Sequence, residues 1–303
     1  MKVLVVGGTG MIGVQAAREL RRRGAEVTVG ARKPPDADAP AGAFALLIGD
    51  YTSGGFSRSE LARFDAVVFA AGNDIRHVPA GADLAEFWRR TQSDGVPAFA
   101  ARVRDAGVAR LIQIGSYYHQ LRPDLAQTLP YVAARRAADE RTRALAAPGF
   151  CVATLNPPSI VGALPGASVQ RYRALTAWAR GRSPQIGHWA PPGGTNYMSL
   201  RSLGQAIAGA VEHAESGRAY LIGDENLSYR AFFQLFFDAV GSSVRLETRD
   251  AEHPLLPDRF IVQGRGNTLR YEADMAQSAL LGYERNDIER AVTEVVALVE
   301  AAP

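Results

Sequence analysis

The stretch VLVVGGTGMIG near the N-terminus constrains the fold of this 303-residue chain more than any other segment. Gly7, Gly10 and Gly13 follow a short apolar run at residues 2–6 and lie at the start of a helical pattern at residues 11–23. Glycines allow a tight turn and a close backbone approach to a pyrophosphate, and the helix N-terminus attracts its charge. This order of strand, glycine turn and helix predicts dinucleotide binding. The expected contacts are Gly7, Thr9, Gly10, Met11, Ile12 and Gly13. The alternative is a glycine turn that serves close packing alone.

Short apolar runs alternate with helical patterns through the first half of the chain, which is typical of βαβ units and a parallel sheet. The predicted strands are residues 2–6, 26–30, 43–48, 65–70, 110–114 and 151–155. The predicted helices are residues 11–23, 59–64, 84–106 and 131–147. Pro97 is expected to bend or divide the third of these helices. The fold class we expect is α/β: a doubly wound parallel Rossmann sheet with a smaller C-terminal α/β substrate domain.

The texture of the sequence changes after Asn156. NPPSIVGALPGAS and HWAPPGGTN read as Pro/Gly-rich loops on either side of the helical stretch VQRYRALTAWARG. SLGQAIAGAVEHA, RAYLIGD and SYRAFFQLFFDAVG then predict a helix, a strand and a helix, with the phenylalanines of FFQLFF in the core. The domains we expect are a dinucleotide-binding domain at residues 1–157, to which residues 195–224 return, and a substrate-binding domain at residues 158–194 and 225–303.

Composition argues against several classes of protein. The one cysteine, Cys151, has no partner for an internal disulfide, and the five histidines lack the spacing of metal ligands. The formal net charge of +3, with basic and acidic residues mixed, disfavours nucleic-acid binding. No apolar run approaches the roughly 20 residues of a membrane span, and the N-terminal run is too short for a signal peptide. We expect a cytoplasmic protein without metal, membrane or nucleic-acid partners.

The end of the second predicted strand selects between NAD and NADP. Folds that bind NAD usually place an acidic residue there, about 20 residues beyond the glycines, to hold the ribose 2′-hydroxyl. This chain has VTVGARK instead, with Arg32 and Lys33 at that point and no carboxylate to repel a 2′-phosphate. Arg32 offers a planar set of donors for that phosphate, so NADP is the expected cofactor and NAD the less favoured one. The alternative is that both cations are ordinary solvated loop charges.

Two further strand ends are expected to contact the cofactor. Asp50, in LLIGDY, is placed to accept a hydrogen bond from the adenine amino group, with Tyr51 beside it. A lone aspartate at a strand end also caps turns, so that alternative stays open. The small residues of FAAG that close the fourth strand suit a close approach of the cofactor, and they suit close packing as well. They are Ala70, Ala71 and Gly72.

Several segments, taken in chain order, resemble the extended short-chain dehydrogenase/reductase family, which contains NAD-dependent epimerase/dehydratases and dihydroflavonol-reductase-like enzymes. They are the glycine motif, FAAG, AGVARLIQIGS, PYVAARRAADE, LNPPSIVG and the tail EADMAQSALLGYERNDIERAVTEVV. The resemblance covers essentially the whole chain and implies the Rossmann fold. It also implies cofactor contacts from Pro157 and Ser159 in LNPPSIVG, and a homodimer through residues 84–106 and 131–147, with a monomer as the alternative.

In that family a serine, a tyrosine and a lysine carry out hydride-transfer chemistry. The resemblance places at Ser116 the serine that hydrogen-bonds the substrate oxygen, and at Tyr131 the general acid/base. The lysine, which binds the nicotinamide ribose and stabilises tyrosinate, falls on Arg135. Arginine keeps the charge but does not readily release a proton. Because only Lys2 and Lys33 among 34 basic residues are lysines, this arginine also reflects the general composition.

Alternatives remain for the individual side chains. Tyr117, Tyr118 or His119 in GSYYHQ are other candidates for the acid. Taken singly, Ser116 is better explained as a turn-capping serine, and Tyr131 as a half-buried aromatic at a helix start. Their joint placement, after the fifth strand and at the start of the next helix, favours a site.

The expected function is that of an NADP-dependent oxidoreductase acting on a carbonyl or secondary alcohol of a medium-sized, partly apolar substrate. The short segment YYHQLRPDLAQTLP between serine and tyrosine argues against nucleotide sugars, because the family members that use them resemble one another in carrying an acidic, proline-punctuated insertion there. One alternative is an epimerase or dehydratase with tightly bound cofactor. Another is a non-catalytic NADP-binding sensor or scaffold, which Arg135 in place of lysine favours.

Overall fold

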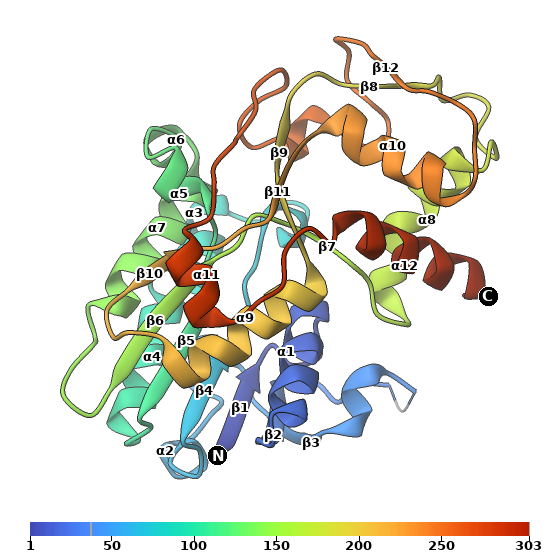
Figure 1. The fold of residues 1–303 in the computed structure, drawn as a ribbon. Helices are drawn as coiled ribbons and strands as arrows, with labels where there is room; N and C mark the ends of the chain where they lie inside the picture. Colours follow the sequence, from blue (N-terminus) through green and yellow to red (C-terminus); the bar gives the residue numbers. More distant parts are fainter. Residues whose placement is uncertain (37, 303) are drawn as a thin grey trace. The chain divides into compact units, whose positions relative to one another are not determined.

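A computed structural model describes residues 1–36 and 38–302, and the chain divides into two compact units (Figure 1). The first unit is Met1–Pro157, Ser202–Ile222 and Ala273–Tyr283, and the second is Pro158–Arg201, Gly223–Glu272 and Glu284–Pro303. The observed boundaries differ from the expected ones: the returning segment begins at Ser202, and a further segment at 273–283 joins the first unit. Among the described residues, no helix is long and apolar enough to cross a membrane.

The first unit is built on a seven-stranded sheet in the order β10-β6-β5-β4-β1-β2-β3, with every pair parallel. Its strands are β1 Lys2–Val6, β2 Glu26–Ala31, β3 Ala45–Ile48, β4 Ala66–Phe69, β5 Arg110–Ile114, β6 Cys151–Asn156 and β10 Ala219–Leu221. The predicted Rossmann-type sheet is confirmed. Strand order reverses between β1 and β4, the place where such sheets bind ligands at their carboxyl ends.

Helices flank this sheet (Figure 1). They are α1 Met11–Arg22, α2 Arg58–Leu61, α3 Leu84–Trp88, α4 Gly95–Asp105, α5 Tyr118–Leu121, α6 Leu125–Thr128, α7 Pro130–Arg143, α9 Leu200–His213 and α11 Met275–Leu281. The core that holds them includes Leu4, Val67, Phe99, Leu111 and Val152. The inner strands β1, β4, β5 and β6 are buried because helices cover both faces of a parallel sheet, which is why they read as continuous apolar runs, whereas the edge strand β3 exposes Leu46 and Ile48.

The long helix predicted at residues 84–106 is divided, but not by Pro97. A π-helical segment, Arg89–Ser93, separates α3 from α4. Pro97 lies in the first turn of α4, where its missing N–H removes no intrahelical hydrogen bond. The Gly95 backbone lies so close to the preceding turn that a Cβ there would be 1.9 Å from the Arg90 carbonyl oxygen. π-Helical segments are frequent at functional sites, and this one carries Gln92, which contacts Arg135.

The second unit holds a three-stranded sheet, β11-β9-β7, and a two-stranded one, β12-β8. The strands are β7 Ser159–Val161, β8 Trp189–Ala190, β9 Gly194–Ser199, β11 Glu225–Ser228 and β12 Glu247–Thr248. The helices are α8 Gln170–Ala179, α10 Tyr229–Ala239 and α12 Ile288–Ala301. The two stretches predicted as loops therefore contain β7, β8 and the start of β9. Their periodicity is hidden because each strand is short and flanked by Pro and Gly. The FFQLFF phenylalanines are buried in this unit's core, as predicted.

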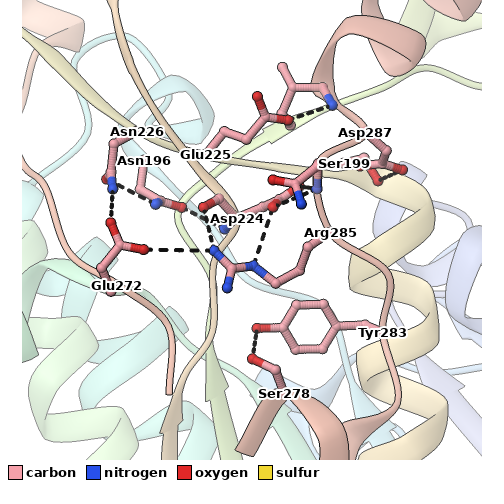
Figure 2. A network of polar contacts seen from close by, with 12 residues as sticks. Asn196, Ser199, Asp224, Glu225, Asn226, Glu272, Ser278, Tyr283, Arg285 and Asp287 are labelled. Carbon is pink, nitrogen blue, oxygen red and sulfur yellow. Dashed lines mark hydrogen bonds and ion pairs between the residues drawn. The ribbon is translucent and has the colours of Figure 1, made fainter. Parts of the chain in front are cut away.

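A polar network in the second unit fixes the start of α12 (Figure 2). The fully buried carboxylate of Asp224 accepts the backbone N–H of Asn286 at 2.8 Å and lies 3.4 Å from the Arg285 Nε. Glu225 accepts the N–H of Ile288 at 3.0 Å. Burial raises the pKa of Asp224 despite these donors. Asn286 adopts a left-handed backbone, φ 60°, which the two carboxylates hold in place.

Candidate active site

The glycine turn between β1 and α1 has the geometry of a phosphate cradle. The N–H groups of Gly7 and Gly8 donate to the Gly30 carbonyl at 2.9 and 3.1 Å, which joins the turn to the end of β2. Gly7 has φ 80°, a conformation that L side chains rarely adopt. A Cβ on Gly13 would lie 2.2 Å from the Gly7 carbonyl oxygen, so helix and turn can meet only at glycine.

The first turn of α1 is left open for an anion. Its N-cap, Gly10, provides no side-chain hydrogen bond, and no acidic residue lies in the first turn. The uncapped N–H groups and the helix dipole together favour a phosphate. Thr9 and Gly10 are exposed and Met11 and Ile12 are half-buried, whereas Gly13 is buried between turn and helix. The residues present therefore fit a dinucleotide pyrophosphate.

Arg32 directly follows β2 and is exposed, next to the strand end that receives the cradle's N–H groups. Within the part of the chain that the structure describes, its guanidinium has no hydrogen bond and no ion pair, and neither has Lys33. A guanidinium without a protein partner at this strand end is free to bind a phosphate. The 2′-phosphate contact itself stays a prediction.

Asp50 and Tyr51 both have roles of their own in the protein. Asp50 Oδ1 accepts hydrogen bonds from the Thr52 N–H at 2.9 Å and from its hydroxyl at 2.8 Å, so the turn-capping alternative is present in the structure. The buried Tyr51 hydroxyl donates to the Thr91 carbonyl at 2.8 Å. Burial, with the Asp50 charge nearby, raises the pKa of Tyr51 to about 12. Adenine contacts from this pair stay a prediction.

The small residues at the end of β4 are explained by the protein's own packing. A Cβ on Gly7 would lie 2.6 Å from the Ala71 backbone nitrogen, so the cradle passes directly over this strand end. A Cβ on Gly72 would lie 2.8 Å from Nη1 of Arg135. Glycine at position 72 thus makes room for the arginine that stands in the lysine position.

Arg135, on α7, is 7% exposed, and its guanidinium faces the carboxyl end of β5. Nη2 donates to the carbonyls of Ile114, at 3.0 Å, and of Gly115, and Nη1 lies 3.4 Å from the Gln92 Oε1. These contacts use three of the five N–H groups of the guanidinium and leave two for other acceptors. None of its partners among the described residues is a carboxylate.

Ser116 and Tyr131 both precede this arginine in the chain. Ser116 follows β5 and is buried, and its backbone N–H donates to Asn156 Oδ1 at 2.8 Å. Tyr131 begins α7, one helical turn before Arg135, and is half-buried. Its ring packs against Trp88, with centroids 5.2 Å apart, and against Tyr118 at 6.4 Å. A continuous series of contacts therefore runs from the cradle through Ala71, Gly72 and Arg135 to the residue before Ser116.

A buried polar cluster behind Ser116 carries no recognisable sequence motif. Asp139 Oδ2 lies 2.8 Å from His119 Nε2, and Oδ1 lies 2.6 Å from Arg143 Nε. Burial alone would raise the pKa of Asp139, but the bonds from His119 and Arg143 outweigh it and lower the pKa to about 2. Asn156 Nδ2 reaches the same carboxylate at 3.4 Å. His119, an alternative acid, is therefore held by a carboxylate, and its other ring nitrogen is buried without a partner among the described residues.

The remaining predicted cofactor contacts fall on both sides of a unit boundary. Pro157 is buried at the end of the first unit, directly after β6, and Ser159 belongs to β7 of the second unit. The structure describes each within its own unit, and their cofactor contacts stay predictions. Gln92, Asp139 and Asn156 are the site residues that the sequence reasoning missed. Asp139 lies four residues after Arg135 in PYVAARRAADE, and Asn156 lies in LNPPSIVG, so both belong to segments that carry the resemblance, although neither was predicted as a site residue.

Known proteins share this architecture over the whole chain. A UDP-N-acetylglucosamine 4-epimerase from Bacillus cereus is 15% identical, covers 99% of this chain and 100% of its own, and superposes with a TM-score of 0.74. A UDP-glucose-4-epimerase from Stenotrophomonas maltophila, solved with bound NAD and formylated UDP-arabinopyranose, is 20% identical over 99% and 98% of the two chains, with a TM-score of 0.72. At these identities the likeness shows the fold alone.

A third structure, a UDP-glucuronic acid 4-epimerase from Bacillus cereus in complex with NAD, is 14% identical over 99% of each chain, with a TM-score of 0.71. No curated protein sequence matches the chain. The model of the family described as NAD dependent epimerase/dehydratase matches residues 3–223, which is well over half of the chain. The chain therefore belongs to the NAD-dependent epimerase/dehydratase family.

Proposed function

We propose that this protein is an NADP-dependent oxidoreductase that acts on a carbonyl or secondary alcohol of a medium-sized, partly apolar substrate. The observation that carries the proposal is the series of contacts from the phosphate cradle, through Gly72 and Arg135, to the peptide before Ser116. It places the serine, and the helix that bears Tyr131, at the carboxyl edge of the sheet, beside the switch point where such folds bind dinucleotides. A bound nicotinamide would supply or accept the hydride.

The chain's own residues divide the remaining chemistry. The Ser116 hydroxyl would hydrogen-bond the reacting oxygen, and the Tyr131 hydroxyl would give it a proton or take one from it. The buried charge of Arg135, one helical turn from Tyr131, favours the anion that remains when the tyrosine has given up its proton. The two uncommitted N–H groups of Arg135 are available to ribose hydroxyls.

The apolar character of the proposed substrate rests on the surroundings of Tyr131. Phe87 and Trp88 are buried beside it, with Ile75, Val78 and Tyr131 packed against them as one hydrophobic cluster. A substrate whose carbonyl reaches Tyr131 meets this aromatic wall, which favours apolar groups next to the reacting carbon.

NADP is preferred over NAD because of Arg32. Its exposed guanidinium lacks a protein partner among the described residues and lies where an acidic residue would otherwise bind the ribose. Two of the structures named above, the UDP-glucuronic acid 4-epimerase and the UDP-glucose-4-epimerase, hold NAD, so NAD is the competing cofactor. Calorimetric titration with NADPH, NADP⁺, NADH and NAD⁺ tests the choice. We expect the phosphorylated forms to bind about tenfold tighter or more, and tighter binding of the NAD forms would reject it.

Turnover is tested separately from binding. Purified protein with NADPH and a panel of aromatic and aliphatic ketones and aldehydes should oxidise the cofactor, as followed by its absorbance. If NADPH binds tightly but no member of the panel is reduced, and no alcohol is oxidised with NADP⁺, the oxidoreductase proposal fails and the sensor or scaffold alternative takes its place.

A second candidate function is epimerisation with a resident cofactor, which the 4-epimerases among the solved relatives favour. In that case the dinucleotide would co-purify with the protein, and a substrate would change configuration without net cofactor consumption. Mass spectrometry of the purified protein, followed by NMR of UDP-sugars incubated with it, distinguishes this activity from net reduction. The short segment between Ser116 and Tyr131 argues against nucleotide sugars as substrates.

A further inference from the structure

We propose that Arg135 and Asn156 clamp the Gly115–Ser116 peptide at its two ends, and that this clamp positions the Ser116 hydroxyl. The proposal rests on the function proposed above, in which Ser116 binds the reacting oxygen. It gives Arg135 a task that the family lysine would not perform in the same way. It also assigns a positioning role to Asn156, the second residue of LNPPSIVG, for which the sequence alone suggested no role.

Both polar groups of one peptide unit are held by side chains. The Gly115 carbonyl accepts a hydrogen bond from Arg135 Nη2, and the Ser116 N–H donates to Asn156 Oδ1 at 2.8 Å. The described chain contains no cis peptide, so this carbonyl and this N–H point in opposite directions within one rigid peptide plane. Fixing both groups fixes the plane, and with it the direction in which the Ser116 side chain leaves the backbone.

The Asn156 end of the clamp is built with little freedom. Asn156 is fully buried, and a Cβ on Gly115 would lie 1.8 Å from its Oδ1, so the amide occupies the space of a side chain at position 115. Its Nδ2 donates to Gln120 Oε1 at 3.0 Å and reaches the Asp139 carboxylate at 3.4 Å. Because Nδ2 has these two acceptors, Oδ1 is the atom that must face the Ser116 N–H.

The Arg135 end is equally constrained. The same Nη2 also donates to the Ile114 carbonyl at 3.0 Å, while Nη1 lies against Gly72 and 3.4 Å from the Gln92 Oε1. The planar guanidinium is thus held by two strand ends and the π-helical segment: Nη2 alone meets two successive carbonyls, and Nη1 meets Gln92. A lysine ammonium at this position is a single nitrogen on a flexible stem, and it cannot make the two carbonyl contacts and the separate Gln92 contact with the fixed geometry of a planar group.

One helix controls both ends of the clamp. Arg135 and Asp139 are one turn apart on α7. Arg135 bonds the Gly115 carbonyl directly, whereas Asp139 acts on the peptide through its contact with Asn156. Tyr131 lies one turn before Arg135 on the same helix. α7 therefore sets the position of the serine relative to the tyrosine, which is the geometric requirement for transferring a proton to an oxygen that the serine holds.

The clamp predicts that restoring the family lysine damages the site. In Arg135→Lys we expect kcat for the best panel carbonyl to fall about tenfold or more, with its KM and the NADPH affinity nearly unchanged. In Asn156→Ala, which removes the acceptor, we expect the same pattern, together with amide exchange at Ser116 that is about tenfold faster or more. The primary isotope effect on kcat with deuterated NADPH should rise in both variants, because the chemical step itself becomes slower.

Val152→Ala is the matched control. Val152 is fully buried on the same strand as Asn156 and packs in the first unit's core, so the variant loses stability without touching the clamped peptide. It should change neither the isotope effect nor the exchange of the Ser116 amide. A merely structural role for Asn156 would make Asn156→Ala behave like this control.

Three results would overturn the clamp. They are a kcat that rises in Arg135→Lys, Ser116 exchange that is unchanged in Asn156→Ala, and a loss of NADPH affinity in Arg135→Lys that accounts for the whole loss of activity. If the wild-type protein reduces no carbonyl at all, the proposed function fails. The clamp is then judged on Ser116 exchange alone, so the two failures remain distinguishable.

Discussion

Arg135 carries a buried positive charge, and the described residues offer it neutral oxygens but no carboxylate within ion-pair distance. A buried charge is costly unless hydrogen bonds or a counter-charge offset the loss of water. Two carbonyls and one amide oxygen meet part of that need. An anion that forms beside the arginine, such as a deprotonated Tyr131, would meet the rest, and a half-reaction that creates such an anion is therefore favoured at this position.

The proposed role of Tyr131 as general acid or base is tested by removing its hydroxyl group alone. Tyr131→Phe keeps the ring contact with Trp88 and removes only the hydroxyl. We expect kcat to fall by about 10²- to 10⁴-fold, the usual contribution of a general acid or base, with NADPH affinity unchanged. Tyr118→Phe, in the same aromatic group, is the matched control. If Tyr118→Phe loses the activity and Tyr131→Phe keeps it, the acid has been assigned to the wrong ring.

The proposed contact between Arg32 and the 2′-phosphate is tested by comparing the affinities for NADPH and NADH. Arg32→Ala should weaken NADPH binding by about 10- to 100-fold, because hydrogen bonds to a charged group contribute about 1.5–3 kcal/mol. NADH affinity should stay the same, since no 2′-phosphate is involved. Lys33→Ala, the neighbouring exposed cation, is the control and should change both affinities little. Calorimetry at one fixed salt concentration measures all of them, and equal losses for NADPH and NADH would reject the assignment.

Among the secondary-structure elements, the β1–α1 turn contains one glycine that is needed for packing and another that is needed mainly for ligand contact. A Cβ on Gly13 would lie 2.2 Å from the Gly7 carbonyl oxygen, whereas one on Gly10 would lie 3.4 Å from the same atom. Gly13→Ala should lower the free energy of unfolding by about 1–3 kcal/mol, as overpacking does, and should lose NADPH binding as well. Gly10→Ala should cost at most about 1 kcal/mol through its poorer N-cap, yet still weaken binding.

Denaturant unfolding and calorimetry on the two glycine variants measure these effects. Equal destabilisation of both would contradict the packing role of Gly13, and full NADPH affinity in Gly10→Ala would contradict a close approach of the pyrophosphate to that backbone. The contrast is informative because the two residues belong to one motif and differ in what surrounds them.

At the scale of the whole molecule, the two units respond differently to acid. In the second unit His253 is fully buried among Trp178, Trp189 and Phe233, and burial lowers the pKa of His253 to about 4. In the first unit, hydrogen bonds overcome the effect of burial and lower the pKa of Asp139 to about 2. The stabilisation from Asp139 is lost only when the pH falls from its ordinary value of 3.8 through about 2.

The second unit should therefore lose stability first on acidification. Unfolded histidine titrates at 6.5, so between that pH and about 4 the unfolded chain binds a proton that the folded chain does not. Lowering the pH from 7 to 5 should cost about 2 kcal/mol. Raised pKa values of Asp224 and Glu225 oppose this loss as those carboxylates become protonated. Tryptophan fluorescence reports mainly this unit, which holds two of the three tryptophans.

His253→Asn is the informative variant for the pH effect. An asparagine oxygen can accept the Leu255 N–H that His253 Nδ1 accepts at 3.1 Å, and it does not titrate. The variant should be less stable at pH 7, because a ring is lost from the core, but the loss of stability between pH 7 and 5 should shrink. His213→Asn, an exposed histidine at the end of α9, should keep the wild-type dependence. An unchanged pH dependence in His253→Asn would contradict the assignment to this group.

The features of this protein that are encoded locally can be predicted from its sequence. The buried strands of the first unit were readable because continuous apolar runs alternate with helical periodicity, and the cradle because only glycine suits a tight turn that meets a helix. The resemblance then placed Ser116, Tyr131 and Arg135 at their positions in the fold. The short strands β7, β8 and β9 escaped because they lie among prolines and glycines, whose local preferences hide them.

The surroundings of the candidate site depend on contacts between segments that are far apart in the chain. Gln92 reaches Arg135 across 43 residues, and Asn156 reaches Ser116 across 40, so neither contact leaves a periodic trace in the chain. Gly72 packs against the Arg135 guanidinium, and Gly115 packs against the Asn156 amide. Each glycine is needed because a side chain from a distant segment fills the space that its own side chain would occupy. Local sequence fixes backbone preference, whereas a buried hydrogen bond depends on which distant group the fold brings within reach. The hydrogen bonds at the strand ends around Ser116 are of this second kind, so they could not be predicted from the sequence.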